Sequence, residues 1–105
     1  MEKTFEQVYM EHIAFTSKTF PKGTSIGALL HAEREIEEVR QDIINQKSGA
    51  EKAIEYADII GCIMDSANRE GIGSRDIIKA WDNKLQINKS RAWKDNGDGS
   101  YSHIK

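Results

Sequence analysis

The sequence is poor in cysteine and proline, has no long apolar run and carries almost no excess charge. Its single cysteine, Cys62, excludes an intramolecular disulfide and fits a reducing compartment. The net charge of −2 at pH 7 predicts no general affinity for nucleic acid or for an anionic membrane. No apolar stretch approaches the roughly 20 residues of a membrane-spanning helix, and the first residues lack the apolar core of a signal peptide. We therefore expect a cytoplasmic protein with neither nucleic-acid nor membrane partners.

The balance of charged and hydrophobic residues favours a soluble helical domain. Charged residues make up 30% of the chain and hydrophobic residues 38%, which argues against disorder. A chain of 105 residues fits one domain, but the core that one copy can build is modest. We therefore expect copies of the chain to associate, because together they bury more apolar surface.

Apolar residues recur with helical spacing in four stretches, and no segment shows strand-like alternation. The tail from Asp95 is expected to be a turn followed by a loose end. These patterns predict an all-α, antiparallel bundle of about four helices that oligomerisation completes. We expect one helical domain over residues 1–95 and a C-terminal tail over 96–105. The first two predicted helices cover residues 4 to about 18 and about 25 to 46. The third follows a turn at residues 47–51 and runs to about residue 70, and the fourth begins at residue 74.

Two acidic pairs stand out in the second and third predicted helices. Glu35 and Glu38 are three residues apart, as are Glu55 and Asp58, so each pair lies on one face of its helix. If these helices pack antiparallel, four carboxylates meet, and such a cluster is either splayed into water or held by cations. Hard divalent cations such as Mg²⁺ prefer carboxylate oxygens and keep positions for phosphate and water. The alternative is a solvated face on a non-catalytic helical interaction protein.

Residues near these pairs allow more than one interpretation. His31 lies one turn before Glu35 and is either a metal ligand or a hydrogen-bond partner of that carboxylate, and we favour the partner. Asp42 extends the acidic line by one turn, and we interpret it as solvated surface rather than as an outlying ligand or a supporting acid. Cys62 lies within the acidic stripe of the third helix, which should raise the pKa of its thiol and argues against a nucleophilic role.

A basic stripe follows in the fourth predicted helix. Lys84, Asn88 and Arg91 are spaced i, i+4 and i+7, so they share one face. Two cations and an amide suit a phosphate, while the plain alternative is a basic helix C-terminus that favours the helix dipole. Trp81 and Trp93 are aromatic side chains that can stack on a nucleobase, although we expect Trp81 in the core. Acidic and basic sets together are what a metal–triphosphate substrate requires.

The acidic spacing resembles the signature of the all-α nucleoside triphosphate pyrophosphohydrolases, the MazG-like superfamily. That signature is Glu-x-x-Glu, a spacer and then Glu-x-x-Asp, and the chain is most similar to the dATP/dGTP diphosphohydrolase-like group of bacteria and phages. Two positions depart from this group, because Tyr56 replaces a common Trp and Lys94 replaces a Pro. The matching motifs are His31-x-x-x-Glu35-x-x-Glu38, Glu55-Tyr56-x-Asp58, Arg69-x-Gly71 and Lys84-x-x-x-Asn88-x-x-Arg91-x-Trp93.

The resemblance implies Mg²⁺-dependent hydrolysis of a (deoxy)nucleoside triphosphate to the monophosphate and pyrophosphate, with Mn²⁺ able to substitute. It also implies a homodimer or homotetramer with sites near the subunit interface. A relative that acts on dUTP or phosphoribosyl-ATP is the alternative within the superfamily. The residues it implies are Glu35, Glu38, Glu55 and Asp58 as catalytic metal ligands, and His31, Lys84, Asn88, Arg91 and Trp93 at the substrate.

Overall fold

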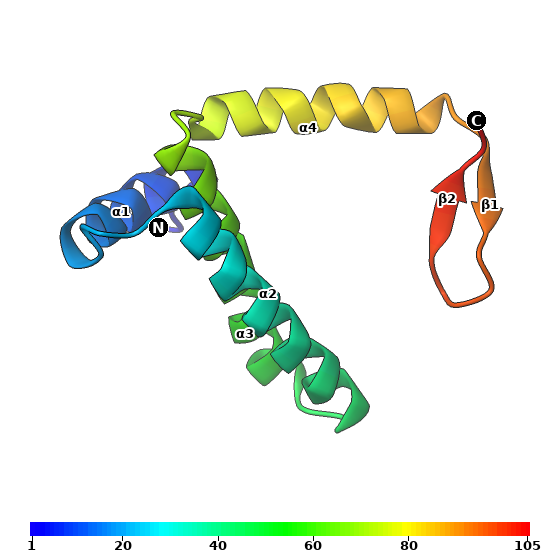
Figure 1. The fold of residues 1–105 in the computed structure, drawn as a ribbon, viewed down its shortest axis with the longest axis horizontal. Helices are drawn as coiled ribbons and strands as arrows, with labels where there is room; N and C mark the ends of the chain where they lie inside the picture. Colours follow the sequence, from blue (N-terminus) through cyan, green and yellow to red (C-terminus); the bar gives the residue numbers. More distant parts are fainter. The chain divides into compact units, whose positions relative to one another are not determined.

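The computed structural model describes residues 1–105 and contains four α-helices and one short β-hairpin (Figure 1). The chain forms two compact units, Met1–Ser74 and Arg75–Lys105. None of the helices combines the length and the apolarity needed to cross a bilayer. The predicted all-α class and the four predicted helices are confirmed. The elements are α1 (Phe5–Thr19), α2 (Ser25–Ile44), α3 (Gly49–Arg69), α4 (Ser74–Lys89), β1 (Trp93–Asp95) and β2 (Tyr101–His103).

Side-chain caps fix where the first three helices begin. The Thr4 hydroxyl accepts a hydrogen bond from the Gln7 N–H at 3.1 Å, and the Gln7 side chain accepts one from the Thr4 N–H at 2.8 Å. Thr24 and Ser48 each accept from the N–H three residues ahead, at 2.9 and 3.1 Å. Because caps act locally, the sequence predicts these helix starts to within a residue or two.

The helices α2 and α3 lie side by side as an antiparallel pair, and α1 packs against α3 (Figure 1). The buried apolar side chains are few, namely Tyr9 of α1, Ala32 and Val39 of α2, and Met64 of α3. No large side chain is fully buried, and many apolar residues of all three helices are exposed. Exposed apolar surface of this extent agrees with the expectation that copies associate, and oligomerisation stays a prediction.

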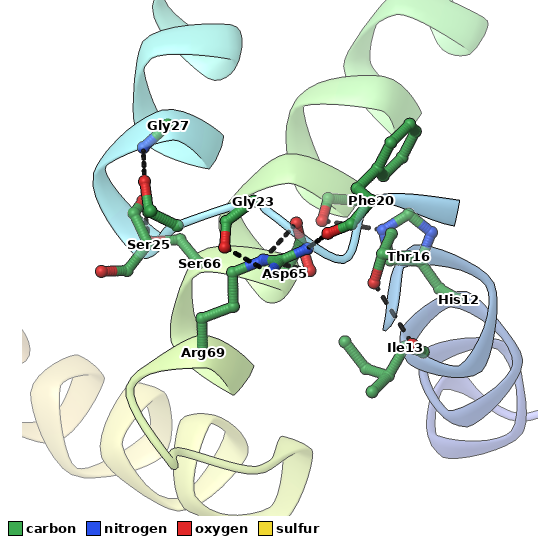
Figure 2. A network of polar contacts seen from close by, with 12 residues as sticks. His12, Ile13, Thr16, Phe20, Gly23, Ser25, Gly27, Asp65, Ser66 and Arg69 are labelled. Carbon is green, nitrogen blue, oxygen red and sulfur yellow. Dashed lines mark hydrogen bonds and ion pairs between the residues drawn. The ribbon is translucent and has the colours of Figure 1, made fainter. Parts of the chain in front are cut away.

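Arg69 fastens the connection between α1 and α2 to the end of α3 (Figure 2). Its Nη1 donates to the Gly23 carbonyl at 2.7 Å and its Nη2 to the Phe20 carbonyl at 3.2 Å. Its Nε donates to both carboxylate oxygens of Asp65 at 3.2 Å. The two side chains of this ion pair are only 17% and 12% exposed. The guanidinium therefore joins the end of α1, the start of α2 and the last turn of α3.

The C-terminal residues form a hairpin, so the expected loose end is wrong. Strand β1 pairs antiparallel with β2, and the register places Trp93 opposite His103 and Asp95 opposite Tyr101. Strands of three residues are too short for an alternating pattern to be recognised in the sequence. The predicted division into residues 1–95 and 96–105 stays a prediction, and the hairpin pairs residues from both sides of it.

Acidic side chains hold the hairpin turn. Asp98 accepts hydrogen bonds from the Ser100 hydroxyl at 2.6 Å and from the Ser100 N–H at 2.9 Å. These two bonds lower the pKa of Asp98, because they favour its ionised form. Gly97 and Gly99 take φ values of 81° and 90°, a region that other residues rarely adopt. Local turn chemistry thus closes a segment that lacks any apolar periodicity.

Candidate active site

Three carboxylates converge within the unit Met1–Ser74. Glu35 and Glu38 lie one turn apart on α2, and Glu55 belongs to the neighbouring helix α3. One carboxylate oxygen from each residue lies within 4.8 Å of the other two. We term Glu35, Glu38 and Glu55 the acidic cluster. The predicted meeting of carboxylates from two antiparallel helices is thus found for three of the four acids.

Glu55 is the member of the acidic cluster that has a buried carboxylate oxygen and a raised pKa. Its Oε2 atom is buried and has no hydrogen-bond partner. Burial raises the pKa of Glu55, and the charges of Glu38, Asp42 and Glu35 raise it further. No ion pair involves Glu38 or Glu55. An unpaired buried oxygen beside further carboxylates fits a hard divalent cation, which binds through oxygen ligands.

Asp58, the fourth predicted ligand, lies one turn beyond Glu55 on α3 and is not part of the acidic cluster. Its side chain is exposed and lines a separate cavity next to α1. Sequence spacing places Glu55 and Asp58 on one helix face. Whether both reach one point depends on the rotation of α3 against α2, which the spacing alone does not encode.

His31 lies beside the acidic cluster. Its Nε2 atom is 3.2 Å from Oε1 of Glu35, which agrees with the expected hydrogen-bond partnership. Because a carboxylate only accepts hydrogen bonds, this ring nitrogen carries the proton. The contact therefore orients the Glu35 carboxylate from the side of the preceding helical turn.

Asp42 is closer to the acidic cluster than its interpretation as solvated surface implies. It is half-buried and lines a cavity of about 330 Å³ together with Glu38 and Glu55. Its charge also contributes to the raised pKa of Glu55. The sequence shows that Asp42 lies one helical turn after Glu38. The partial burial of Asp42, however, depends on how closely α3 packs against α2. The remaining residues of this acidic cavity are Arg34, Glu37 and Gln41.

A second and larger cavity, of about 620 Å³, opens between α1 and the α2–α3 pair. Most of its lining is apolar and aromatic, whereas His31 and Asp58 supply polar groups from α2 and α3. Cys62 also lines it, and burial followed by the charges of Glu35 and Asp58 raises the pKa of its thiol, as predicted. Sequence reasoning assigned no functional residue to α1, although α1 supplies one wall of this cavity.

The predicted phosphate-binding residues belong to the unit Arg75–Lys105. The Trp93 indole N–H donates to the Asn88 carbonyl at 2.9 Å, and Arg91 Nη1 lies 3.5 Å from the Asn88 side-chain oxygen. The Trp93 ring meets the His103 ring edge-on, with centroids 6.1 Å apart. Asn88, Arg91 and Trp93 thus form one local group at the end of α4, and Lys84 lies exposed one turn earlier.

Trp81 does not lie in a core, contrary to expectation, because 69% of its surface is exposed. Its helix α4 is the only helix among residues 75–105. The apolar face of α4 therefore has no helical partner inside its own unit.

Comparison with known proteins gives consistent matches. A family model described as dATP/dGTP pyrophosphohydrolase matches residues 8–105. A dATP/dGTP diphosphohydrolase of Salmonella phage PMBT28 is 31% identical over 90 residues, which are 86% of this chain. The match covers 28% of that relative, so the chain spans little more than a quarter of its length.

A solved structure supports the same grouping. The MazG-like pyrophosphohydrolase of cyanophage S-2L aligns with 99% of this chain and 100% of its own, at a TM-score of 0.77 and 25% identity. That protein was solved bound to dGDP and three catalytic Mn²⁺ ions per active site. The alignment covers both α1 and the C-terminal hairpin of the present chain.

Proposed function

Since the chain belongs to the dATP/dGTP pyrophosphohydrolase family, we propose that it hydrolyses a deoxynucleoside triphosphate to the monophosphate and pyrophosphate. We assign Mg²⁺ as the cofactor, with Mn²⁺ able to replace it. The cyanophage S-2L relative, with dGDP and Mn²⁺ in its site, supports a purine deoxynucleotide and a divalent ion. The substrate is a small nucleotide rather than a nucleic acid.

The acidic cluster is the observation that carries this proposal. Its three carboxylate oxygens, one from each residue, lie within 4.8 Å of one another, and Glu55 also has a buried oxygen without a hydrogen-bond partner. These oxygens form a donor set for a hard cation. We assign Glu35, Glu38, Glu55 and Asp58 as ligands, although Asp58 requires a shift toward the cluster or a second ion. When bound, a divalent ion neutralises phosphate charge and makes water more acidic.

The protein's own side chains would orient the reactants and move one proton. In the reaction, a water oxygen bonds to phosphorus, the anhydride bond between the α- and β-phosphates breaks, and pyrophosphate leaves. We assign the proton released by water to a carboxylate of the acidic cluster, because these are the bases nearest the ion site. His31 would hold the Glu35 carboxylate in place through its 3.2 Å hydrogen bond.

Substrate binding would also use the group at the end of α4. We assign Lys84, Asn88 and Arg91 to phosphate oxygens, because cations and amide N–H groups suit that anion. The contact of Arg91 with the Asn88 side chain supports a shared role. Trp93 is the aromatic member of this group, and its indole N–H already pairs with the Asn88 carbonyl.

A pyrophosphate-release assay tests the proposal. The panel contains the common ribo- and deoxynucleoside triphosphates, dUTP and phosphoribosyl-ATP, each with Mg²⁺ or Mn²⁺. We expect the fastest turnover with dATP or dGTP, and losses of about 100-fold or more in Glu38→Gln and Glu55→Gln. Glu33→Gln is the matched control, because Glu33 is an exposed acid of α2 outside the acidic cluster.

Two results would contradict the proposal. Preference for dUTP or phosphoribosyl-ATP would reassign the substrate while keeping the ion site. Absence of pyrophosphate from every substrate with either ion, together with no rise in melting temperature on adding the ions, would instead favour a non-catalytic interaction protein.

A further inference from the structure

The turn of the C-terminal hairpin contains the only asparagine of the chain that is followed directly by glycine, Asn96–Gly97. Residues 92–102 around this pair are all exposed. In such a pair the backbone nitrogen of the glycine can attack the side-chain amide carbon of the asparagine, because glycine has no Cβ to hinder the approach. Asparagine is a thermolabile residue in proteins, and Asn96 has the neighbour that makes the loss of its amide easiest.

The nitrogen that would attack is held by an acidic side chain. The Gly97 N–H donates to Oδ1 of Asp95 at 2.8 Å, the pattern of an Asx turn. Attack requires this nitrogen to lose its proton, and the loss would place two negative charges 2.8 Å apart. The bond to Asp95 therefore suppresses the nucleophile for as long as the turn is closed.

The amide that would be attacked is held as well. Its Nδ2 donates to the hydroxyl oxygens of Ser100 at 3.0 Å and Ser102 at 2.9 Å. The two protons of the amide group are thus both used. The backbone N–H of Asn96 also donates to the Ser100 carbonyl at 3.0 Å. Attack makes the amide carbon tetrahedral and finally expels Nδ2, so both side-chain bonds must break along the way.

The hairpin that supplies these bonds is a weak element. Its strands β1 and β2 have three residues each and pair only with each other. A single two-stranded hairpin is marginally stable in water, and segments with exposed backbone hydrogen bonds open locally at small cost in free energy. Asn96 therefore alternates between a closed turn, in which both reacting groups are held, and an open turn, in which both are free.

We propose that Asn96 is a site of spontaneous deamidation and that opening of the hairpin sets its rate. In the open turn the Gly97 nitrogen loses its proton to solvent and bonds to the amide carbon of Asn96. The bond from that carbon to Nδ2 breaks, and Nδ2 takes up a proton and leaves as ammonia, which gives a cyclic succinimide. Water then adds to one of the two ring carbonyls and breaks its bond to nitrogen. The sum is asparagine and water to ammonia and either aspartate or isoaspartate, without oxidation or reduction.

Either product loosens the turn. A carboxylate at position 96 has no N–H to donate, and the Ser100 hydroxyl that it would face already donates to Asp98. Three acids, at positions 95, 96 and 98, would then follow one another closely and repel. Isoaspartate also adds one carbon to the backbone, which disturbs the pairing of Asp95 with Tyr101. The product therefore does not close the hairpin as asparagine does.

Peptide mapping by mass spectrometry measures the reaction directly and does not depend on the proposed function. The full chain is incubated at neutral pH, and conversion appears as the mass increase from amide to acid, while protein isoaspartyl methyltransferase labels the isoaspartate. We expect Asn96 to convert faster than the other four asparagines, and faster still when guanidinium chloride unfolds the chain. These internal controls, each followed by a residue with a side chain, are Asn45, Asn68, Asn83 and Asn88.

Ser102→Ala tests whether the hairpin sets the rate. The substitution removes one acceptor of the Asn96 amide and keeps the bonds between Asp98 and Ser100. The conversion rate should rise about three- to tenfold, the factor by which loss of one hydrogen bond raises the population of an open state. In guanidinium chloride the variant and the wild type should convert equally fast. Ser17→Ala, an exposed position of α1, is the matched control and should convert at the wild-type rate.

Two outcomes would overturn the inference. Conversion of Asn96 no faster than that of the other asparagines would remove the modification site. Equal rates for the wild-type protein in buffer and in guanidinium chloride, with the same rate in Ser102→Ala, would mean that the closed hairpin does not protect the pair and that its opening does not set the rate.

Discussion

Replacement of Arg69 by alanine should be among the most destabilising single changes in the chain. The substitution removes two charged hydrogen bonds to the Gly23 and Phe20 carbonyls and leaves Asp65 without its cation. The pair is largely buried, with side chains 17% and 12% exposed. Removal of one partner from a buried pair costs about 3–5 kcal/mol, against a total stability of about 5–15 kcal/mol for a domain of this kind.

Urea denaturation followed by circular dichroism measures this loss. Both proteins are compared at one protomer concentration, because association contributes to apparent stability. For a chain of this length, a loss of 3 kcal/mol lowers the melting temperature by more than about 10 °C. Arg40→Ala is the matched control, because the pair of Arg40 with Glu37 is 70% and 58% exposed. Exposed pairs contribute about 0.2–1 kcal/mol.

A mutant cycle with Gly23 tests the geometry itself. A Cβ at position 23 would lie 2.7 Å from Nη2 of Arg69, so Gly23→Ala should destabilise the wild-type protein by displacing the guanidinium (Figure 2). The same change should cost nothing in the Arg69→Ala background, because the obstructed group is gone. The reasoning is refuted if Arg69→Ala costs no more than Arg40→Ala, or if Gly23→Ala costs the same in both backgrounds.

Three further predictions follow from other parts of the chain. In EDTA, Glu55→Gln should melt at a higher temperature than wild type, because the substitution removes repulsion between carboxylates of the acidic cluster. Mg²⁺ should raise the melting temperature of the wild-type protein only. Calorimetry with and without Mg²⁺ measures both effects, and an equal effect of Mg²⁺ on the two proteins would contradict the ion site. Because Ser100 lowers the pKa of Asp98, the ionised form stabilises the hairpin above the ordinary pKa of 3.8, and this contribution is lost as the pH falls through the lowered pKa. NMR titration should show the pKa of Asp98 rising in Ser100→Ala, and an unchanged pKa would contradict the contact. Trp93→Phe keeps an aromatic ring but loses the bond to the Asn88 carbonyl, so KM should rise severalfold if that bond positions Asn88, whereas an unchanged KM would assign the ring alone to Trp93.

The fold was predictable where information is local. The helices α1, α2 and α3 begin at caps that the sequence displays, and their apolar spacing fixes the faces that pack. The hairpin was not predictable from spacing, because its turn depends on Asp98 and Ser100 side chains rather than on a run of strand residues. Trp81 was expected in the core and is exposed. An apolar helix face predicts burial, but it does not identify the element that covers it.

The sequence predicted which acids of the candidate site share a helix face, but not how the faces of α2 and α3 are rotated against each other. The i, i+3 spacing placed Glu35 beside Glu38, and the short connection after α2 favoured the antiparallel pairing of α2 with α3 that brings Glu55 to them. The exclusion of Asp58 from the acidic cluster and the partial burial of Asp42 depend on the rotation of α3 against α2, which no spacing within one helix encodes. The contact between His12 Nε2 of α1 and the Gly61 carbonyl of α3, at 3.0 Å, gave no signal in the sequence, because the two residues are 49 positions apart.

The energetics of the acidic cluster favour a site over a surface. Acids that serve only solubility have no reason to meet across two helices, because like charges repel and each carboxylate is more stable in water. Here Glu55 keeps one oxygen buried without a partner, and no lysine or arginine pairs with Glu38 or Glu55. Local choices that lower stability are expected at functional sites, where a bound group restores the balance. A divalent ion would supply the missing positive charge, so the arrangement that is unfavourable for the metal-free chain would be favourable for the metal-bound chain.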